Sequence, residues 1–341
     1  MIYENRDKLA SQIEGDLLAL LDEFYSLPEV WDDELTRQIH EWYANAEKVW
    51  PKRPYFSPSS TNSCPRELYM KAKGAKRDVT KAQPHQSRWR RLGTVVGDFI
   101  QEDILKIERN FEKKTGNAPR FKFVRNEDGT PMFEDFAKTN KLIEHNGEKF
   151  YLFGSPDGIM NYVTDDGEIV RVGLEIKSKQ TTPARTSTYS LREPQQDHAK
   201  QCIAYSAMFD CDYYVVLYVN AAKKKWNMTE DEYEKTPDLR AFCMHITDED
   251  RNGLFDELAE NIKAVNSGNP PKLDIEKFRF NNFKTACAND LSEAEVDELE
   301  TYAMAVKYSS LPSWKKQTIA DDVKTIKELR KEGAISNGRK R

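Results

Sequence analysis

The hydrophobic periodicity of this chain changes near residue 120, and that change limits the choice of fold more than any other feature. Upstream, apolar residues recur at helical spacing, whereas downstream they alternate with a period of two. Residues 157–163 and 169–179 are such alternating runs, and Asp166-Gly167 between them indicates a β-hairpin. A continuous apolar run at 213–219 follows a predicted helix and is typical of a covered central strand. We therefore predict an α/β (α+β) fold in which helices flank a central mixed β-sheet.

The predicted sheet lies between two segments with helical periodicity. Apolar residues in the first fifty positions recur at helical spacing, and Pro51 and Pro54 end that region. A strong amphipathic helix is predicted at 88–110, and further helices are predicted at 194–209, 248–266 and 292–308. The predicted domains are a helical N-terminal extension at 1–54, a core at 55–247, and a helical C-terminal extension with a basic tail at 248–341.

Composition narrows the class of protein. The chain is 38% hydrophobic and 32% charged, and it holds no apolar run long enough to span a membrane. Its first residues lack the apolar stretch of a secretory signal, so we expect an intracellular, cytoplasmic protein with no membrane partner. The five cysteines form no C-x-x-C pair, which argues against a disulfide framework or a zinc ribbon and favours buried thiols.

The charge is distributed unevenly along the chain. The formal net charge is −5, which argues mildly against a nucleic-acid partner. Residues 71–91 nevertheless contain eight Lys or Arg and a single acid, Asp78. Such a local patch is what phosphate binding requires, but it is equally compatible with a solvated loop.

The predicted hairpin brings three ionisable residues together. Side chains alternate along a strand, so Glu175 and Lys177 share one face while Ile176 points to the other. Pairing across the hairpin can bring Asp157 beside Glu175. Two adjacent carboxylates favour a cation such as Mg²⁺, and a neighbouring lysine suits phosphodiester hydrolysis. The alternative is a surface hairpin of alternating charge, because Glu-x-Lys alone is common.

The surroundings of this trio resemble the PD-(D/E)XK nuclease superfamily, in its RecB-like branch, which includes the CRISPR-associated RecB-like exonucleases and many phage nucleases. The matching segments occur in the family's order and cover about 57–220. They are a Ser-rich segment ending in Cys64-Pro65-Arg66, the helix segment from Leu92 to Asp98, the Gly154-x-x-Asp157 and Glu175-Ile176-Lys177 pair, and Gln201-x-x-x-Tyr205. The resemblance implies a restriction-endonuclease-like core.

The resemblance also implies roles for individual residues. Asp157, Glu175 and the backbone carbonyl of Ile176 would be metal ligands, and Lys177 would be the catalytic lysine. Gln201 and Tyr205 share a helical face and would hold DNA or orient the lysine, the alternative being that Tyr205 packs in the core. The residues expected to contact DNA are Arg66, Ser178, Lys179, His198, Arg88, Arg90 and Arg91.

Two departures from the family pattern affect the expected site. Gly97 stands where the family's helix carries a metal-binding His, so Asp98, or else Glu102, is the expected replacement. Several relatives hold a [4Fe–4S] cluster with a Cys like Cys64 and three clustered C-terminal Cys. Such a C-terminal cluster is absent from this sequence, so no iron–sulfur cluster is expected.

These features together predict a Mg²⁺- or Mn²⁺-dependent DNA exonuclease that acts on ends or single strands in recombination, repair or end processing. An endonuclease of the same fold, and an inactive relative that only binds DNA or protein, are the alternatives. A phage origin, which would place the protein in the host cytoplasm, and a homo-oligomer or a recombination partner protein are further expectations that the sequence leaves open.

Overall fold

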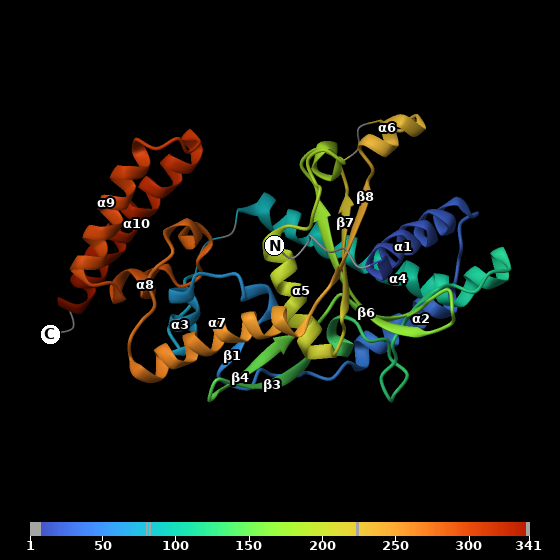
Figure 1. The fold of residues 1–341 in the computed structure, drawn as a ribbon, viewed down its shortest axis with the longest axis horizontal. Helices are drawn as coiled ribbons and strands as arrows, with labels where there is room; N and C mark the ends of the chain where they lie inside the picture. The colour runs from blue at the N-terminus through green and yellow to red at the C-terminus, as the bar shows by residue number, and fades with distance from the viewer. Residues whose placement is uncertain (1–7, 80, 82, 223–224, 339–341) are drawn as a thin grey trace.

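The computed structural model describes residues 8–79, 81, 83–222 and 225–338, and it is built around a five-stranded mixed sheet (Figure 1). The spatial order of the strands is β2–β5–β6–β7–β8. Their bounds are β2 Phe121–Phe123, β5 Gly158–Val163, β6 Ile169–Lys179, β7 Tyr213–Asn220 and β8 Leu239–His245. The predicted class, a mixed β-sheet flanked by helices, is confirmed.

The topology of this sheet follows from its connections. β5 and β6 form the predicted antiparallel hairpin, with Gly158 paired to Leu174 and Val163 paired to Ile169. Helix α5 (Gln196–Phe209) lies in the crossover from β6 to β7, which pair in parallel, whereas β8 returns antiparallel to β7. β7 is therefore central and covered, as its unbroken apolar run predicts.

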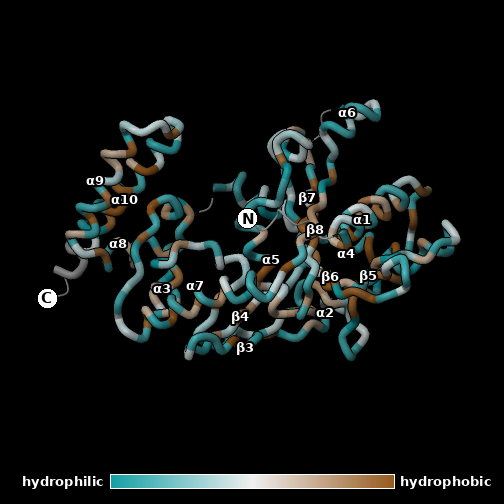
Figure 2. The backbone as a smooth tube through the Cα atoms, in the orientation of Figure 1, coloured by the Kyte–Doolittle hydropathy of each residue, from teal (hydrophilic) through white to brown (hydrophobic). Residues whose placement is uncertain are grey.

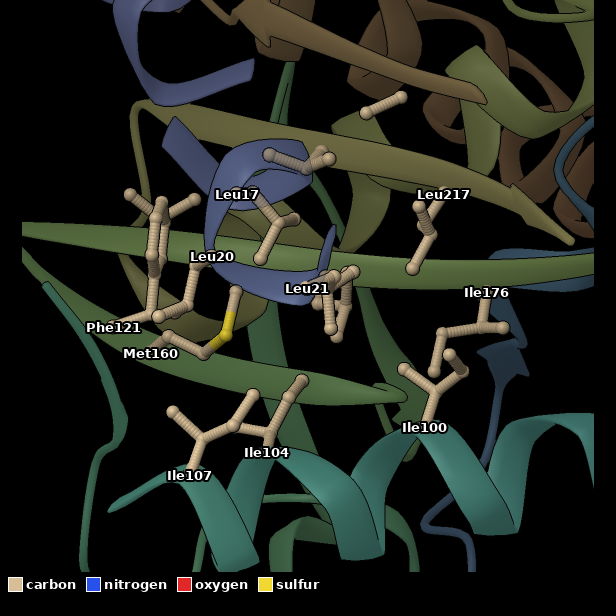
Figure 3. Packing of buried hydrophobic residues seen from close by; sticks show 14 of the residues in the cluster. Leu17, Leu20, Leu21, Ile100, Ile104, Ile107, Phe121, Met160, Ile176 and Leu217 are labelled. Atoms are coloured by element: carbon tan, nitrogen blue, oxygen red, sulfur yellow. The ribbon is translucent and has the colours of Figure 1, made fainter. Parts of the chain in front are cut away.

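One face of the sheet is covered by α1 (Lys8–Ser26) and α4 (Pro84–Thr115). Figure 3 shows leucines of α1, isoleucines of α4 and Ile176 of β6 meeting in one cluster. Helix α2 (Asp33–Asn45) adds Leu35 and Ile39 to the same cluster. The residues predicted as an N-terminal extension at 1–54 thus include two helices that belong to the main core, because their apolar stripes have this sheet face to bury against.

The opposite face packs against α5 and α7 (Asp248–Ser267). Tyr214, Val216 and Tyr218 of β7 point to this side, since they alternate with residues of the α1 face. A smaller sheet of order β1–β4–β3 adjoins it, with β1 at Tyr55–Phe56, β3 at Thr139–His145 and β4 at Glu148–Gly154. In Figure 2 hydrophobic residues concentrate along the central strands and the helix sides that face them.

The C-terminal helices form a separate hydrophobic cluster, drawn in red at the left of Figure 1. Its helices are α8 Lys284–Asp290, α9 Glu293–Lys307 and α10 Ser313–Gly338, preceded by a 3₁₀ segment at Ile275–Phe280. Helix α3 (Pro65–Ala72) packs with this cluster, whereas α7 packs with the sheet. The clusters therefore do not follow the predicted boundary at residue 248. The tail residues 339–341 lie outside the described part.

Four shorter helical segments complete the secondary structure of the described chain. A helix, α6, spans Glu230–Lys235, and 3₁₀ turns lie at Pro58–Ser60, Glu134–Ala137 and Pro183–Thr186. Among the described residues, no helix is long and apolar enough to cross a membrane.

Candidate functional site

Asp157 lies where the β5–β6 ladder ends. The register that pairs Gly158 with Leu174 sets Asp157 opposite Glu175 if it is continued by one residue. The Oδ2 atom of Asp157 accepts a hydrogen bond from the backbone N–H of Ile176 at 2.6 Å. Because the N–H and C=O of one strand residue point to the same edge, the Ile176 carbonyl also faces the Asp157 side.

Glu175 and Lys177 lie on the α5 face of β6, while Ile176 packs into the cluster of α1 and α4. The Nζ atom of Lys177 lies 2.5 Å from Oε1 of Glu175 and donates to Oε1 of Gln201 at 3.0 Å. The side-chain amide of Gln201 in turn donates to Oε1 of Glu175 at 2.9 Å. The alternation predicted for this strand thus builds a closed triangle of lysine, glutamate and glutamine.

Burial around this triangle disfavours the charged forms of Glu175 and of the neighbouring Asp157. Glu175 is 2% exposed, and its Oε2 atom has no hydrogen-bond partner. Burial, and then the neighbouring Glu175, raise the pKa of Asp157 above the usual range of a carboxyl group. Burial also raises the pKa of Glu175, although Lys177 opposes that rise. Burial opposes the charge on Lys177, but the two carboxylates outweigh it, so the pKa of Lys177 is raised.

Tyr205 lies one turn beyond Gln201 on α5 and contacts the backbone just before Asp157. Its hydroxyl donates to the carbonyl of Ser155 at 2.6 Å, which anchors the turn that leads into Asp157. Its ring packs in the core beside Tyr214. The ring of Tyr205 is therefore a core residue, and its hydroxyl positions the backbone of the site, which differs from the expected role of holding DNA or orienting the lysine.

Helix α4 approaches the site through Gln101 rather than through an acid. Gln101 is buried, and its Nε2 atom donates to the carbonyl of Asp157 at 2.7 Å. Gly97 is one turn earlier on the same face, and a Cβ built there meets no atom within 4 Å. Asp98 and Glu102 each follow one of these residues and so are rotated about 100° away.

The described part of the chain contains no group of three or more His, Cys, Asp or Glu side chains arranged to hold a metal ion. Neither Asp98 nor Glu102 is therefore gathered with Asp157 and Glu175, in contrast to the expectation from the sequence. Burial raises the pKa of both Asp98 and Glu102, and Asp98 acts electrostatically on a different carboxylate, Glu134.

Glu134 is a site residue that the sequence did not reveal. It begins the 3₁₀ turn before β3, with φ of 46°, a conformation that side-chain-bearing residues seldom adopt. Its N–H donates to the carbonyl of Pro156 at 2.9 Å, and its Oε1 atom accepts from Gln101 at 3.5 Å. Burial, and then Asp157, raise its pKa to about 7. No local motif marks this residue, because only the tertiary structure brings it to Asp157.

A basic cavity begins where β6 ends. Ser178 and Lys179 line it, together with Arg90 of α4. The Nζ atom of Lys179 donates to Gln195 at 2.7 Å. Arg88 and Arg91 are exposed on the same turn of α4 but do not line the cavity. Part of the basic segment at 71–91 thus borders a cavity and part of it is a solvated helix face, while residues 80 and 82 lie outside the described part.

His198 does not present a cation to this cavity at neutral pH. Its Nδ1 atom lies 2.8 Å from the hydroxyl of Tyr218. Burial, and then the charge of Lys177, lower its pKa to about 4. The expected contact between His198 and DNA would therefore involve a neutral imidazole.

Arg66 has a structural position that contradicts its expected role in phosphate binding. Its side chain is 0% exposed and forms ion pairs with Asp290 at 2.9 Å and Glu295 at 3.0 Å. It also donates to the carbonyl of Pro271 at 2.7 Å. Two acids and a carbonyl thus hold the guanidinium inside the C-terminal cluster, away from any ligand.

All five cysteine side chains are buried, as the spacing predicts. Cys64 and Cys287 lie in the C-terminal cluster, Cys202 of α5 and Cys211 lie in the cluster on the α5 face of the sheet, and Cys243 lies on the α1 face. The sulfur of Cys64 accepts a hydrogen bond from the N–H of Asp274 at 3.2 Å. These thiols therefore belong to separate regions of the core.

Comparisons with known proteins give only distant structural similarity. No family model and no curated protein sequence matches this chain. It aligns with the solved structure of SSO0001 at 13% identity and a TM-score of 0.38, covering 76% of this chain and 97% of that one. The alkaline exonuclease LHK-Exo from Laribacter hongkongensis aligns at 14% identity and a TM-score of 0.36, covering 67% and 93%. A phage-related exonuclease from Haemophilus somnus 129PT aligns at 13% identity and a TM-score of 0.29, covering 62% and 79%. Such low scores carry no conclusion about the activity of this chain.

Proposed function

We propose that this protein is a divalent-metal-dependent nuclease that hydrolyses phosphodiester bonds in DNA. The observation that carries the proposal is the buried pair of Asp157 and Glu175, joined by Lys177, at the edge of a basic cavity. Buried carboxylates with raised pKa values are unfavourable for folding and are therefore typical of functional sites.

The donor set fits a hard cation such as Mg²⁺ or Mn²⁺. The Oε2 atom of Glu175 is buried without a partner, and Asp157 and the carbonyl of Ile176 share the adjoining edge of β6. Magnesium commonly binds through one or two carboxylates and keeps several waters, so a third acid is not required. Such an ion, when bound, would lower the pKa of a water and neutralise charge on a phosphate.

The protein's own residues have separable parts in this proposal. Lys177, held by Gln201 and Glu175, presents an ammonium group that can donate to a phosphate oxygen. Tyr205 fixes the turn before Asp157. Arg90 and Lys179 can hold the DNA backbone beside the site.

The specific form that we propose is an exonuclease for DNA ends in recombination, repair or end processing, as the family resemblance implies. End-labelled linear DNA and covalently closed circular DNA, each with Mg²⁺ and with Mn²⁺, test this form directly. Degradation of the linear DNA alone is expected, whereas cleavage of the circle would establish an endonuclease.

Two substitutions test the site itself. Asp157→Asn and Lys177→Ala should each lower cleavage by roughly 10²–10⁴-fold, while Lys149→Ala, an exposed lysine on β4, should leave it unchanged. Calorimetry should show Mn²⁺ binding by the native protein and its loss in Asp157→Asn. Undiminished cleavage by a folded Asp157→Asn, Lys177→Ala double variant would exclude this site as the catalytic centre.

A further inference from the structure

The basic cavity at the end of β6 is large, and among the residues that the structure describes no acid lines it. Its volume is about 1220 Å³, above the range of about 300–1,000 Å³ that is common for small-molecule pockets. The described part of the chain contributes four cations to its lining, which are Lys81, Arg90, Lys179 and Arg185. The charge and the size suit an anionic polymer rather than a single small anion.

Trp89 gives this cavity an apolar surface in an unexpected place. Trp89 continues the face of α4 that carries Val96, Ile100 and Ile107, at intervals of seven, four and seven residues. Those three residues are buried against the sheet, whereas Trp89 is 59% exposed and lines the cavity. The indole thus lies on the core-facing side of α4, but at this end of the helix that side faces the cavity instead of the hydrophobic core.

We propose that this cavity binds a single-stranded segment of nucleic acid, with Trp89 stacked on an unpaired base. Arg90 and Arg185 are exposed and would lie against the phosphates, since basic side chains around an aromatic surface are the usual arrangement for binding single strands. The neutral side chains of Gln86, Gln180 and Thr181 also line the cavity and can hydrogen-bond to base edges or phosphates.

Stacking on Trp89 selects for unpaired bases on physical grounds. Within a duplex, both faces of each interior base are covered by neighbouring base pairs, so an indole can reach a base face only where the strand is open. Stacking on an aromatic residue tolerates any sequence, because every base has a π-face. The cavity would therefore distinguish single-stranded from double-stranded nucleic acid rather than one base sequence from another.

The cavity begins close to the proposed catalytic site along β6. Ser178 and Lys179 directly follow Lys177 on β6, so the cavity begins about 3–7 Å along the strand from the lysine. A Cβ at Gly93 would come within 3.2 Å of Ser178 Oγ, so the helix approaches this strand closely. The inference rests on the proposed function only for the choice of nucleic acid as the polymer.

The test is a binding measurement that needs no cleavage. Fluorescence anisotropy with a labelled oligo(dT), in EDTA, would compare the full-length protein with Trp89→Ala, Trp89→Phe and Trp314→Ala, the last an exposed tryptophan on α10. Trp89→Ala should weaken binding by about 5- to 100-fold, Trp89→Phe should retain most of the affinity, and Trp314→Ala should change nothing.

Two further ligands separate stacking from charge. A blunt duplex and an abasic single strand should bind Trp89→Ala and the native protein equally. Three results would overturn the inference. They are native-like binding of oligo(dT) by Trp89→Ala, an equal loss of affinity for all three ligands in that variant, and no oligo(dT) binding by the native protein. Since binding is read without metal, an inactive protein with Trp89-dependent binding would refute only the nuclease function.

Discussion

Asp157 shows how a single residue can be well positioned and electrostatically unfavourable at once. Its carboxylate is held by the N–H of Ile176 at 2.6 Å, yet burial and Glu175 raise its pKa. The folded protein therefore holds a proton on this group that the unfolded chain releases above pH about 4. This difference removes stability as the pH rises.

Asp157→Asn should accordingly stabilise the protein at pH 8. The variant keeps an oxygen acceptor for Ile176 but no longer has a carboxyl group to ionise, so we expect a gain of about 0.5–2 kcal/mol. Urea unfolding in EDTA at pH 5 and pH 8 measures the difference in the free energy of unfolding between the variant and the native protein. The gain should be larger at pH 8. An equal or smaller gain at pH 8 would show that Asp157 ionises normally.

At the scale of elements, α4 connects the cavity to the site through one stripe of residues. Arg90, Gly93, Gly97 and Gln101 recur at intervals of three and four, so they share a face. Gly93 lies against Ser178, and Gln101 donates to the carbonyl of Asp157. Gly97, where the resembled family carries a histidine, therefore lies on the face that carries Gln101, and a Cβ built there meets no atom within 4 Å.

Gly97→His should increase metal affinity by about tenfold, or ~1.4 kcal/mol. The expected reason is that a Cβ at this position meets no atom within 4 Å, so a histidine side chain would start from open space on the face that carries Gln101. Calorimetric titration with Mn²⁺ measures the change, and Gly97→Ala controls for the effect of removing a helical glycine. Equal affinity of the two variants would mean that this face does not reach the bound ion.

At the scale of the whole molecule, Arg66 links α3 to the C-terminal cluster. Its guanidinium contacts Pro271, Asp290 and Glu295, more than 200 residues away in sequence. Figure 1 shows this cluster beside the sheet domain, with α3 and α7 between them. The two parts are therefore held together by packing around α3 and by a buried network of charges.

Arg66→Ala should destabilise the protein by about 2–4 kcal/mol, because it leaves two acids without their cation. Arg90→Ala is the matched control and should leave the melting temperature unchanged. For DNA binding we expect the opposite, with the larger loss in Arg90→Ala. That substitution should weaken binding and reduce the slope of log affinity against log salt concentration by about one. Reduced DNA affinity in folded Arg66→Ala would restore its predicted role in phosphate binding.

Local sequence predicted the elements whose signals are local. The period-two runs and the turn at Asp166-Gly167 gave the β5–β6 hairpin, and alternation placed Glu175 and Lys177 on one face. The β3–β4 hairpin was missed, although Asn146-Gly147, both with positive φ, is an equally strong turn signal. Its weaker alternation reflects a strand that is only partly buried.

The sequence by itself therefore determined the class of the fold, the central hairpin and the trio of Asp157, Glu175 and Lys177, because each depends on neighbours in the chain. Only the tertiary structure decided that α1 covers the sheet, that Arg66 is buried and that Glu134 and Gln101 border Asp157. These facts depend on which distant surfaces bury one another, and periodicity shows that a face is apolar without showing what covers it.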